Sequence, residues 1–203
     1  WRTRARRFPF PLGRPMTGPT MRNSPDSPLV IAEVLFGEHE GRLGLTICPG
    51  KKDSGRQWDR DLETDLRAIR NWGASTVVTL IEAHEFSLLA IDTLGQEVQR
   101  MGMHWLHLPI RDVDVPDRRF ELAWPAAGAD IHRRIDAGER ILIHCRGGLG
   151  RTGLLAGLIL AERGCAPRDA INRVRAVRPH AIETAAQETY VLKSAANVPV
   201  RMK

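Results

Sequence analysis

The fold is decided by the stretch His144-Cys145-Arg146-Gly147-Gly148-Leu149-Gly150-Arg151-Thr152-Gly153. It follows an apolar run, Ile141-Leu142-Ile143, which predicts a buried strand. It precedes a second apolar run, over residues 154–161, which predicts a helix. A strand that enters a helix through a glycine-rich loop is typical of the carboxyl edge of the sheet in an α/β protein. We therefore expect a central strand, a reactive loop at its end and a buried helix behind the loop.

The rest of the chain alternates between strand patterns and helix patterns. Apolar and β-branched runs predict strands over residues 29–36, 43–48, 75–81, 103–108 and 140–144. Helical spacing, stop glycines and a proline at a helix start predict helices over residues 58–71, 84–90, 93–100, 118–137, 151–163, 167–177 and 184–196. We expect an α/β fold of one domain, with a central, mostly parallel but mixed sheet flanked by helices.

Length and charge divide the 203 residues into an arm, a body and a tail. Residues 1–28 are rich in proline and arginine and predict a disordered basic arm. Residues 29–197 predict the folded domain, and residues 198–203 predict a tail. Six arginines of the 30 Lys and Arg lie within residues 1–22, so the other basic residues balance the 24 Asp and Glu. Nucleic-acid binding is therefore not expected apart from the arm.

The cysteine count restricts the class of protein. The chain has three cysteines, Cys48, Cys145 and Cys165, which is a small and odd number and therefore does not suit a disulfide framework. Free cysteines indicate a reducing compartment, which we take to be the cytoplasm. Their spacing and that of the seven histidines fit no zinc pattern. The apolar run behind the loop is too short to span a bilayer. We expect a monomer without a metal, an organic cofactor or a membrane contact.

The glycine-rich loop has the composition of an anion site. Its glycines let the backbone turn its amides inward, and the helix that follows points its positive dipole end at the same place. Cys145 stands at the start of the loop, where amides, dipole and guanidinium should lower its pKa and produce a thiolate nucleophile. Arg151 closes the loop with a planar fork that can hold two phosphate oxygens. Thr152 can donate its hydroxyl to the sulfur and help it leave.

This loop resembles the signature loop of the cysteine-dependent protein tyrosine phosphatase superfamily. The shared pattern is a cysteine preceded by His, then five residues, then Arg-Thr-Gly, and its glycines are closest to the dual-specificity branch. With Cys48-Pro49-Gly50-Lys51-Lys52 upstream, it resembles the cyclin-dependent-kinase-associated phosphatase group. The resemblance implies a phosphatase-like fold, hydrolysis through a phosphocysteine on Cys145, and no cofactor. It also implies that the substrate phosphate is bound by Arg146, Gly147, Gly148, Leu149 and Gly150.

The resemblance implies a general acid on a separate mobile loop, where it protonates the departing oxygen. The acidic segment over residues 109–117 follows an expected strand and begins Pro-Ile-x-Asp, 33 residues before Cys145. This position favours Asp112 as the acid, and Asp114 is the alternative. Asp117 is expected to cap the helix that follows.

Residues 178–187 resemble the glutamine loop of the superfamily, which positions the water that hydrolyses the phosphocysteine. The family often has glutamine where this chain has Glu183. A carboxylate there can still orient water, but it would repel a dianionic phosphate. Gln187, one helical turn later, is the other candidate for this role. A solvated helix start is an equally good interpretation of both residues.

We expect phosphorylated proteins as substrates, with phosphotyrosine and phosphoserine or phosphothreonine both open. An inositol-phosphate or phosphoinositide phosphatase on the same scaffold is the alternative. Such relatives tend to have lysine at the variable loop positions, where this chain has Arg146 and Leu149. A non-catalytic phosphate-binding module is less expected because the cysteine, arginine and aspartate are all present. A sulfurtransferase is less expected because it does not need the Arg151-Thr152 closure.

The remaining residues receive structural interpretations. Cys48 and Cys165 are expected in the core, with Cys48 also considered as a redox partner of Cys145. Lys51 and Lys52 are expected in a solvated turn, since charge runs usually are. Core positions are also expected for four tryptophans, Trp58, Trp72, Trp105 and Trp124.

Overall fold

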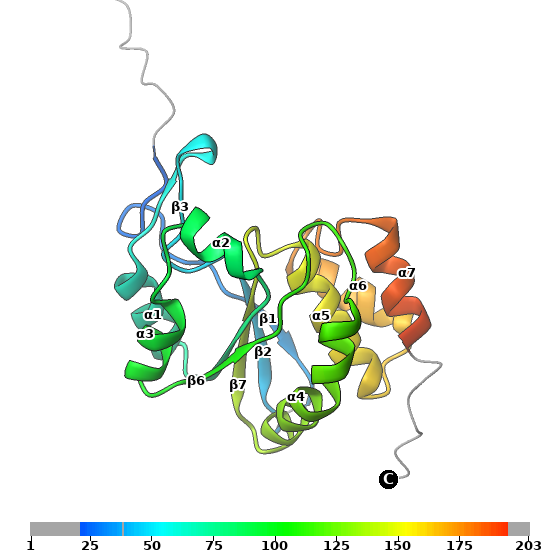
Figure 1. The fold of residues 1–203 in the computed structure, drawn as a ribbon. Helices are drawn as coiled ribbons and strands as arrows, with labels where there is room; N and C mark the ends of the chain where they lie inside the picture. Colours follow the sequence, from blue (N-terminus) through cyan, green and yellow to red (C-terminus); the bar gives the residue numbers. More distant parts are fainter. Residues whose placement is uncertain (1–20, 38, 195–203) are drawn as a thin grey trace, which may run out of the picture.

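A five-stranded sheet forms the centre of the protein, for which a computed structural model describes residues 21–37 and 39–194 (Figure 1). Its strand order is β1-β2-β7-β5-β6, with β1 antiparallel to β2 and every other neighbouring pair parallel. The expected mixed α/β sheet is therefore confirmed. The strands are β1 (Ala32–Leu35), β2 (Arg42–Thr46), β5 (Ala74–Thr79), β6 (His104–His107) and β7 (Arg140–His144).

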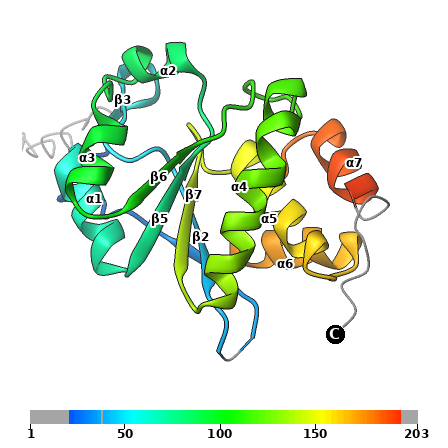
Figure 2. The ribbon, with the colours of Figure 1, turned by 60° about the horizontal axis from the view of Figure 1, so that its bottom comes forward.

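Helices cover both faces of this sheet (Figure 2). One side carries α1 (Leu62–Asn71), α2 (Ala83–Leu88) and α3 (Leu94–Arg100). The other side carries α4 (Arg118–Asp136), α5 (Gly150–Glu162), α6 (Pro167–Val177) and α7 (Ala185–Ser194). Within the second layer α5 is buried along nearly its whole length, because its apolar residues contact the sheet on one side and α6 and α7 on the other. None of the helices formed by residues 21–37 and 39–194 is long and apolar enough to cross a membrane.

A small hairpin changes the expected start of the first helix. Strands β3 (Lys52–Asp53) and β4 (Trp58–Asp59) pair antiparallel across a short 3₁₀ turn, Ser54–Arg56. The helix expected from residue 58 therefore begins only at Leu62. Its N-cap is Asp61, whose carboxylate accepts the Thr64 N–H at 2.7 Å and so satisfies one of the free amides of the first turn. Trp58 and Asp59 instead belong to a strand pair, which local periodicity cannot reveal.

The body also includes residues that were expected in the arm. The Ser24 hydroxyl donates to the Asp65 carboxylate at 2.9 Å and is buried, and Arg22 forms a β-bridge with Trp58. The expected boundary at residue 28 thus falls inside a segment that packs on α1 and on the β3–β4 hairpin. Residues 1–20 of the expected arm, and the expected tail over 198–203, lie outside the described residues.

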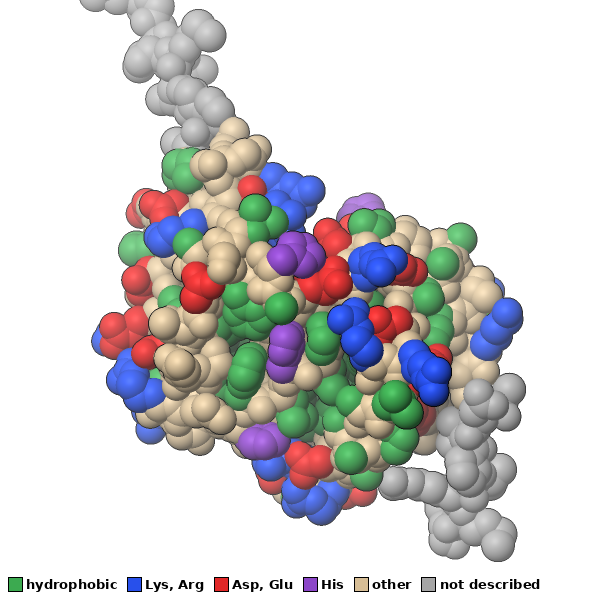
Figure 3. Space-filling view, viewed as in Figure 1, with side chains coloured by type: hydrophobic (Ala, Val, Ile, Leu, Met, Phe, Trp, Pro, Cys, Tyr) green, Lys and Arg blue, Asp and Glu red, His purple; other side chains and the backbone are tan. Residues whose placement is uncertain are grey.

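The strand β6 lies at the edge of the sheet, and aromatic side chains collect beside it. Phe86 of α2 meets both Trp105 and His107 edge-on, with ring centroids 6.4 and 5.3 Å away, and the two β6 rings stack at 5.5 Å. Figure 3 shows hydrophobic and histidine side chains gathered in the middle of this face, with charged side chains around them. These ring contacts therefore pack α2 against one face of the sheet at β6.

The topology brings four loops to one edge of the sheet. Strands β2, β7, β5 and β6 run parallel, so their last residues, Thr46, His144, Thr79 and His107, lie side by side in register. The loops that follow these strands must leave from the same edge. These loops hold the Cys48–Lys51 segment, the start of α2, the acidic segment and the glycine-rich loop.

Candidate active site

The glycine-rich loop turns one of its amides, that of Gly148, toward the Cys145 sulfur. Gly148 has φ of 66°, and a Cβ on it would lie 2.3 Å from the Thr46 carbonyl oxygen, so only glycine fits there. In this conformation the Gly148 N–H donates to the Cys145 sulfur at 3.2 Å. Cys145 is only 3% exposed. The thiol therefore lies at the bottom of a backbone cradle at the start of α5.

Arg151, in the first turn of α5, pairs with one carboxylate from α2 and one from the acidic segment. Its Nη1 lies 2.6 Å from Glu85 Oε2, and its Nη2 lies 3.1 Å from Glu85 Oε1. Nη1 also donates to the Ile110 carbonyl at 3.1 Å, and Nη2 lies 2.8 Å from Asp112 Oδ1. The fork of Arg151 is thus fixed by α2 on one side and by the acidic segment on the other.

The buried pair of Arg151 and Glu85 is ionised in both partners. Burial disfavours the Arg151 cation, but the Glu85 carboxylate, with Cys145 and Asp112, more than offsets burial and raises the arginine pKa. Burial likewise works against the Glu85 anion, but hydrogen bonds from Arg151 and from the Glu82 amide lower its pKa. Glu85 was not anticipated from the sequence. The available signal was an acid just after β5, in an expected short helix at the carboxyl edge of the sheet.

Two polar side-chain atoms in the first turn of α5 are buried and have no hydrogen-bond partner among the described residues. They are Nε of Arg151 and the hydroxyl oxygen of Thr152. A buried donor left without a partner costs free energy, so such atoms in a native protein usually await a ligand or a water. Both belong to the loop that the sequence identified as an anion site. An oxyanion in the cradle would give them an acceptor.

The structure separates the two candidate acids. Asp112 is 51% exposed and its carboxylate touches Arg151 at the loop. The Asp114 carboxylate instead accepts the Val115 amide at 2.8 Å, and the Asp114 carbonyl accepts the side chain of Gln187. Asp117 caps α4 by accepting two backbone amides, as expected. Asp112 is thus the carboxylate of this segment that lies beside the cradle.

Glu183 and Gln187 have different surroundings. The Glu183 carboxylate accepts the Gly150 N–H at 2.7 Å. Gln187 is fully buried, so a solvated helix start does not describe it. Its side-chain oxygen accepts the amides of Glu183 and Thr184, and its nitrogen donates to the Asp114 carbonyl at 3.1 Å. Gln187 therefore ties the acidic segment to the start of α7. A Cβ on Gly150 would lie 3.0 Å from the Gln187 amide and 2.6 Å from the Glu183 carboxylate, so both residues border the loop.

The lysine expected in a solvated turn is buried beneath the loop. Lys51 is 3% exposed, and its ammonium donates to the Arg146 carbonyl at 2.9 Å and lies 4.4 Å from the Trp58 ring centroid. Burial lowers the pKa of Lys51 to about 8. The expectation was wrong for Lys51 because the β3–β4 hairpin folds it inward. Lys52 does lie at the surface, paired with Asp59.

The outer side of the loop is held by two arginines. Arg146 points away from the cysteine and pairs with Asp53 at 2.7 Å. Arg178 donates to the Gly148 carbonyl at 3.0 Å and to the Gly147 carbonyl at 3.4 Å. The two Arg178 contacts occupy loop carbonyls from outside, which leaves the Gly148 amide directed toward the sulfur. Beside them is a cavity of about 290 Å³, which is lined in part by Arg22, Trp58 and Arg178.

Five of the expected core positions need comment. Trp58 lies between the side chains of Arg22 and Lys51 rather than in the core, at 4.3 and 4.4 Å from ring centroid to cation. Trp72, Trp105 and Trp124 pack against the core but remain partly exposed. Cys48 is fully buried, and burial raises the pKa of its thiol. The Cys48 amide reaches the Arg146 carbonyl at 3.5 Å, so this cysteine borders the loop.

His144, the residue before the cysteine, is a neutral anchor. Its Nε2 lies 2.8 Å from the Thr79 hydroxyl, which also accepts the Trp105 indole N–H at 2.9 Å. Burial lowers the pKa of His144 to about 3. The ring is therefore uncharged at neutral pH and links the end of β7 to β5 and β6. In residues 21–37 and 39–194 no group of three or more His, Cys, Asp or Glu side chains is arranged to hold a metal ion.

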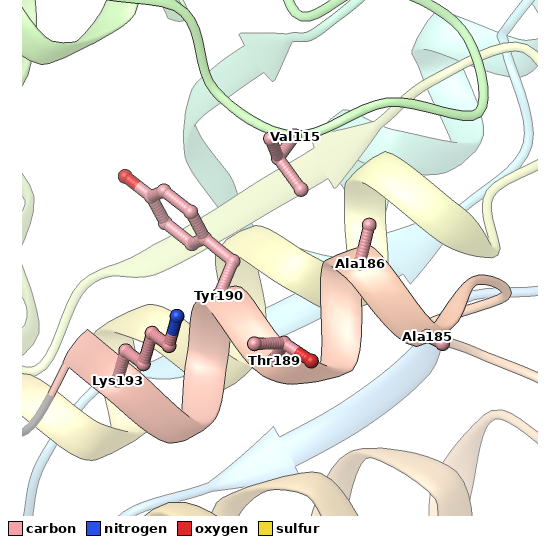
Figure 4. Close-up of a pocket in the computed structure, with 6 residues that line it drawn as sticks. All are labelled: Val115, Ala185, Ala186, Thr189, Tyr190 and Lys193. Carbon is pink, nitrogen blue, oxygen red and sulfur yellow. The ribbon is translucent and has the colours of Figure 1, made fainter.

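A second hollow separates the acidic segment from α7 (Figure 4). Its volume is about 390 Å³. Val115 faces it from the acidic segment, and the other lining residues lie on α7. These are Ala185, Ala186, Thr189, Tyr190 and Lys193. The hollow lies beside the Gln187 contact that joins the same two elements.

Known proteins share this sequence and this architecture. A family model described as PTP-SAK, Swiss Army Knife protein, DSP-PTPase phosphatase domain, matches residues 58–191. The mouse (Mus musculus) protein called cyclin-dependent kinase inhibitor 3 is 30% identical over 151 residues, which cover 73% of this chain and 69% of that protein.

Two crystal structures extend the comparison. Kinase-associated phosphatase, with serine in place of its catalytic-site cysteine, superposes with a TM-score of 0.76 at 24% identity, over 87% of this chain and 99% of that chain. Tk-PTP in its active form gives a TM-score of 0.62 at 28% identity, over 82% and 98%. The chain belongs to the PTP-SAK family of dual-specificity phosphatase domains and is a cysteine-dependent phosphatase.

Proposed function

We propose that this phosphatase hydrolyses phosphoproteins through a phosphocysteine on Cys145. The Cys145 sulfur attacks phosphorus, an S–P bond forms, and the bond from phosphorus to the departing oxygen breaks as Asp112 protonates that oxygen. Water then attacks the phosphocysteine and gives a proton to Asp112, and the S–P bond breaks to release phosphate. Thr152 donates its hydroxyl to the departing sulfur. Arg151 and the loop amides stabilise the phosphoryl oxygens in both steps.

The observation that carries this proposal is the unpartnered Nε–H of Arg151. The other nitrogens of this guanidinium are engaged by Glu85, Ile110 and Asp112, so the free donor is the one left for substrate. It is buried in the first turn of the helix that begins at the cysteine loop. A phosphoryl oxygen next to the sulfur satisfies a donor that the protein leaves open.

Replacement of the nucleophile tests the mechanism. Cys145→Ser should abolish turnover of a phosphopeptide and still bind vanadate or phosphate, because the amides and Arg151 remain. Turnover by this variant at more than about one thousandth of the wild-type rate would contradict a cysteine nucleophile. Calorimetric titration with vanadate separates loss of chemistry from loss of the cradle.

Paired substitutions test the acid. Asp112→Ala should lower kcat by roughly 10²–10⁴, the usual contribution of a general acid. Asp114→Ala is the matched control on the same segment and should retain most of kcat. The reverse result would assign the acid to Asp114.

Two observations favour phosphoprotein substrates: the charge of the loop and the similarity to the relatives named above. Arg146, the cation at a variable loop position, is already neutralised by Asp53 and does not offer a free charge to additional phosphates. The relatives named above are a cyclin-dependent kinase inhibitor and a kinase-associated phosphatase. A panel of phosphotyrosine, phosphoserine and phosphothreonine peptides and inositol phosphates, run on wild type and Cys145→Ser, tests this choice. Higher kcat/KM on inositol phosphates would contradict it.

Catalysis by a free cysteine suits the reducing cytoplasm, which is the compartment that we propose for this enzyme. We also propose that the enzyme is a monomer.

A further inference from the structure

A carboxylate occupies one of the amides that an anion in the cradle needs. The Gly150 N–H donates to Glu183 Oε2 at 2.7 Å. Gly150 is the first residue of α5, and the amides of a first helical turn have no partner within the helix. The preceding residue, Leu149, provides no side-chain cap. Glu183 therefore caps the phosphate-loop helix from a segment that lies 33 residues further along the chain.

The segment that carries Glu183 is held in a strained conformation against α5. His180 and Ile182 have φ of 67° and 60°, in the left-handed region that non-glycine residues rarely adopt. A Cβ on Gly153 would lie 2.8 Å from both the Ala181 Cβ and the Ile182 nitrogen, so the segment packs directly on the helix. Backbone strain of this kind persists only where the surrounding contacts impose it. The position of the Glu183 carboxylate over Gly150 is therefore imposed by the fold.

The charge of this carboxylate has no cationic side-chain partner. Glu85 and Asp112 both form ion pairs with Arg151, whereas Glu183 forms none with any Lys, Arg or His in the part of the chain that the structure describes. The Glu183 carboxylate instead accepts the backbone amide of Gly150. An unneutralised anion thus lies at the positive end of α5, where a phosphate dianion is to bind.

We propose that Glu183 sets the phosphate affinity of the loop, because its carboxylate competes with the phosphate group for the Gly150 amide. The proposal rests on the proposed function, because it assumes that phosphate binds in this loop. A dianionic phosphate must displace the carboxylate and then bind beside it, so Glu183 weakens the binding of substrate and of product phosphate. The enzyme gains rapid release of phosphate at the cost of a higher KM.

The test is Glu183→Gln, which keeps an oxygen to accept the Gly150 N–H and removes only the charge. We expect the inhibition constants of vanadate and inorganic phosphate, and the KM for a phosphopeptide, to fall roughly tenfold. The melting temperature should stay that of wild type, because the cap survives. Glu183→Ala, which removes charge and cap together, should also bind vanadate more tightly, although it should melt at a lower temperature.

The matched control is Glu188→Gln, which removes the same unit of charge from α7, where Glu188 pairs with Arg168 and Arg175. It should leave the inhibition constants unchanged. Wild-type constants in Glu183→Gln, or an equal shift in Glu188→Gln, would overturn the proposal. Failure of the proposed function looks different, because wild type would then neither turn over phosphopeptide nor bind vanadate.

Discussion

Arg151 contacts two carboxylates that differ sharply in exposure. Glu85 is 2% exposed and binds both terminal nitrogens, whereas Asp112 is 51% exposed and touches one. The buried contact is costly to break, because it would leave a buried charge without a partner, and the exposed one is weak. Arg151, which binds the phosphate in the proposed mechanism, is therefore positioned permanently by α2 and exchangeably by the acidic segment. A general acid that must approach and leave the substrate needs a weak, exposed contact like that of Asp112 with Arg151.

Lys51 provides a pH-dependent prediction at the same scale. Its pKa is about 8 in the folded protein and about 10.5 in the unfolded chain, so between these values only the unfolded chain holds the proton. The free energy of unfolding should therefore rise with pH across this window, by up to about 3 kcal/mol. Urea unfolding of wild type and Lys51→Met at pH 7, 9 and 10.5 measures it. Parallel pH profiles for the two proteins would contradict the buried position of this ammonium.

At the scale of elements, the fit of α5 against the Glu183 segment depends on the absence of one side chain. Gly153→Ala places a methyl group 2.8 Å from Ala181 and Ile182, so the helix and the segment must separate. We expect a loss of about 1–3 kcal/mol in the free energy of unfolding, together with reduced kcat/KM. Thermal and chemical denaturation measure the first quantity. Gly55→Ala is the control, since a Cβ there meets only one atom, 3.9 Å away, and it should cost well under half as much.

The elements also show what a sequence can reveal. The β7–loop–α5 unit was predictable because its apolar runs and glycines are contiguous, and so were Cys145 and Arg151. The hairpin of Lys52–Asp53 and Trp58–Asp59 was not, because two-residue strands exist only through pairing between segments. The role of Glu85 was not predictable for the same reason, because its partner Arg151 lies 66 residues away in the sequence. Burial of Lys51 likewise depends on a carbonyl 95 residues away.

At the scale of the whole molecule, one buried carboxylate joins four segments. Asp65 of α1 accepts Arg60 through both oxygens at 2.7 Å, and it also accepts the Gly50 amide and the Ser24 hydroxyl at 2.9 Å. Both members of the Arg60–Asp65 pair are about 1% exposed. The network thereby fixes the N-terminal segment, the hairpin and the Cys48–Lys51 loop to the first helix.

Removal of this carboxylate should destabilise the entire fold. Asp65→Ala leaves the Arg60 charge buried and unpaired, for which we expect a loss of roughly 3–5 kcal/mol in the free energy of unfolding. Guanidinium unfolding followed by circular dichroism gives the value. The surface pair of Arg67 and Glu63 is the comparison, and Glu63→Ala should cost less than about 1 kcal/mol. A loss as small as that in Asp65→Ala would show that the buried network contributes little.

The Gln187 side chain limits how this phosphatase can be re-engineered. One end of its amide binds the backbone at the start of α7, and the other end binds the Asp114 carbonyl in the acidic segment. An acidic loop grafted from another phosphatase must place a backbone carbonyl in register for this contact. The loop and the first turn of α7 therefore form one module, and a chimera should exchange them together.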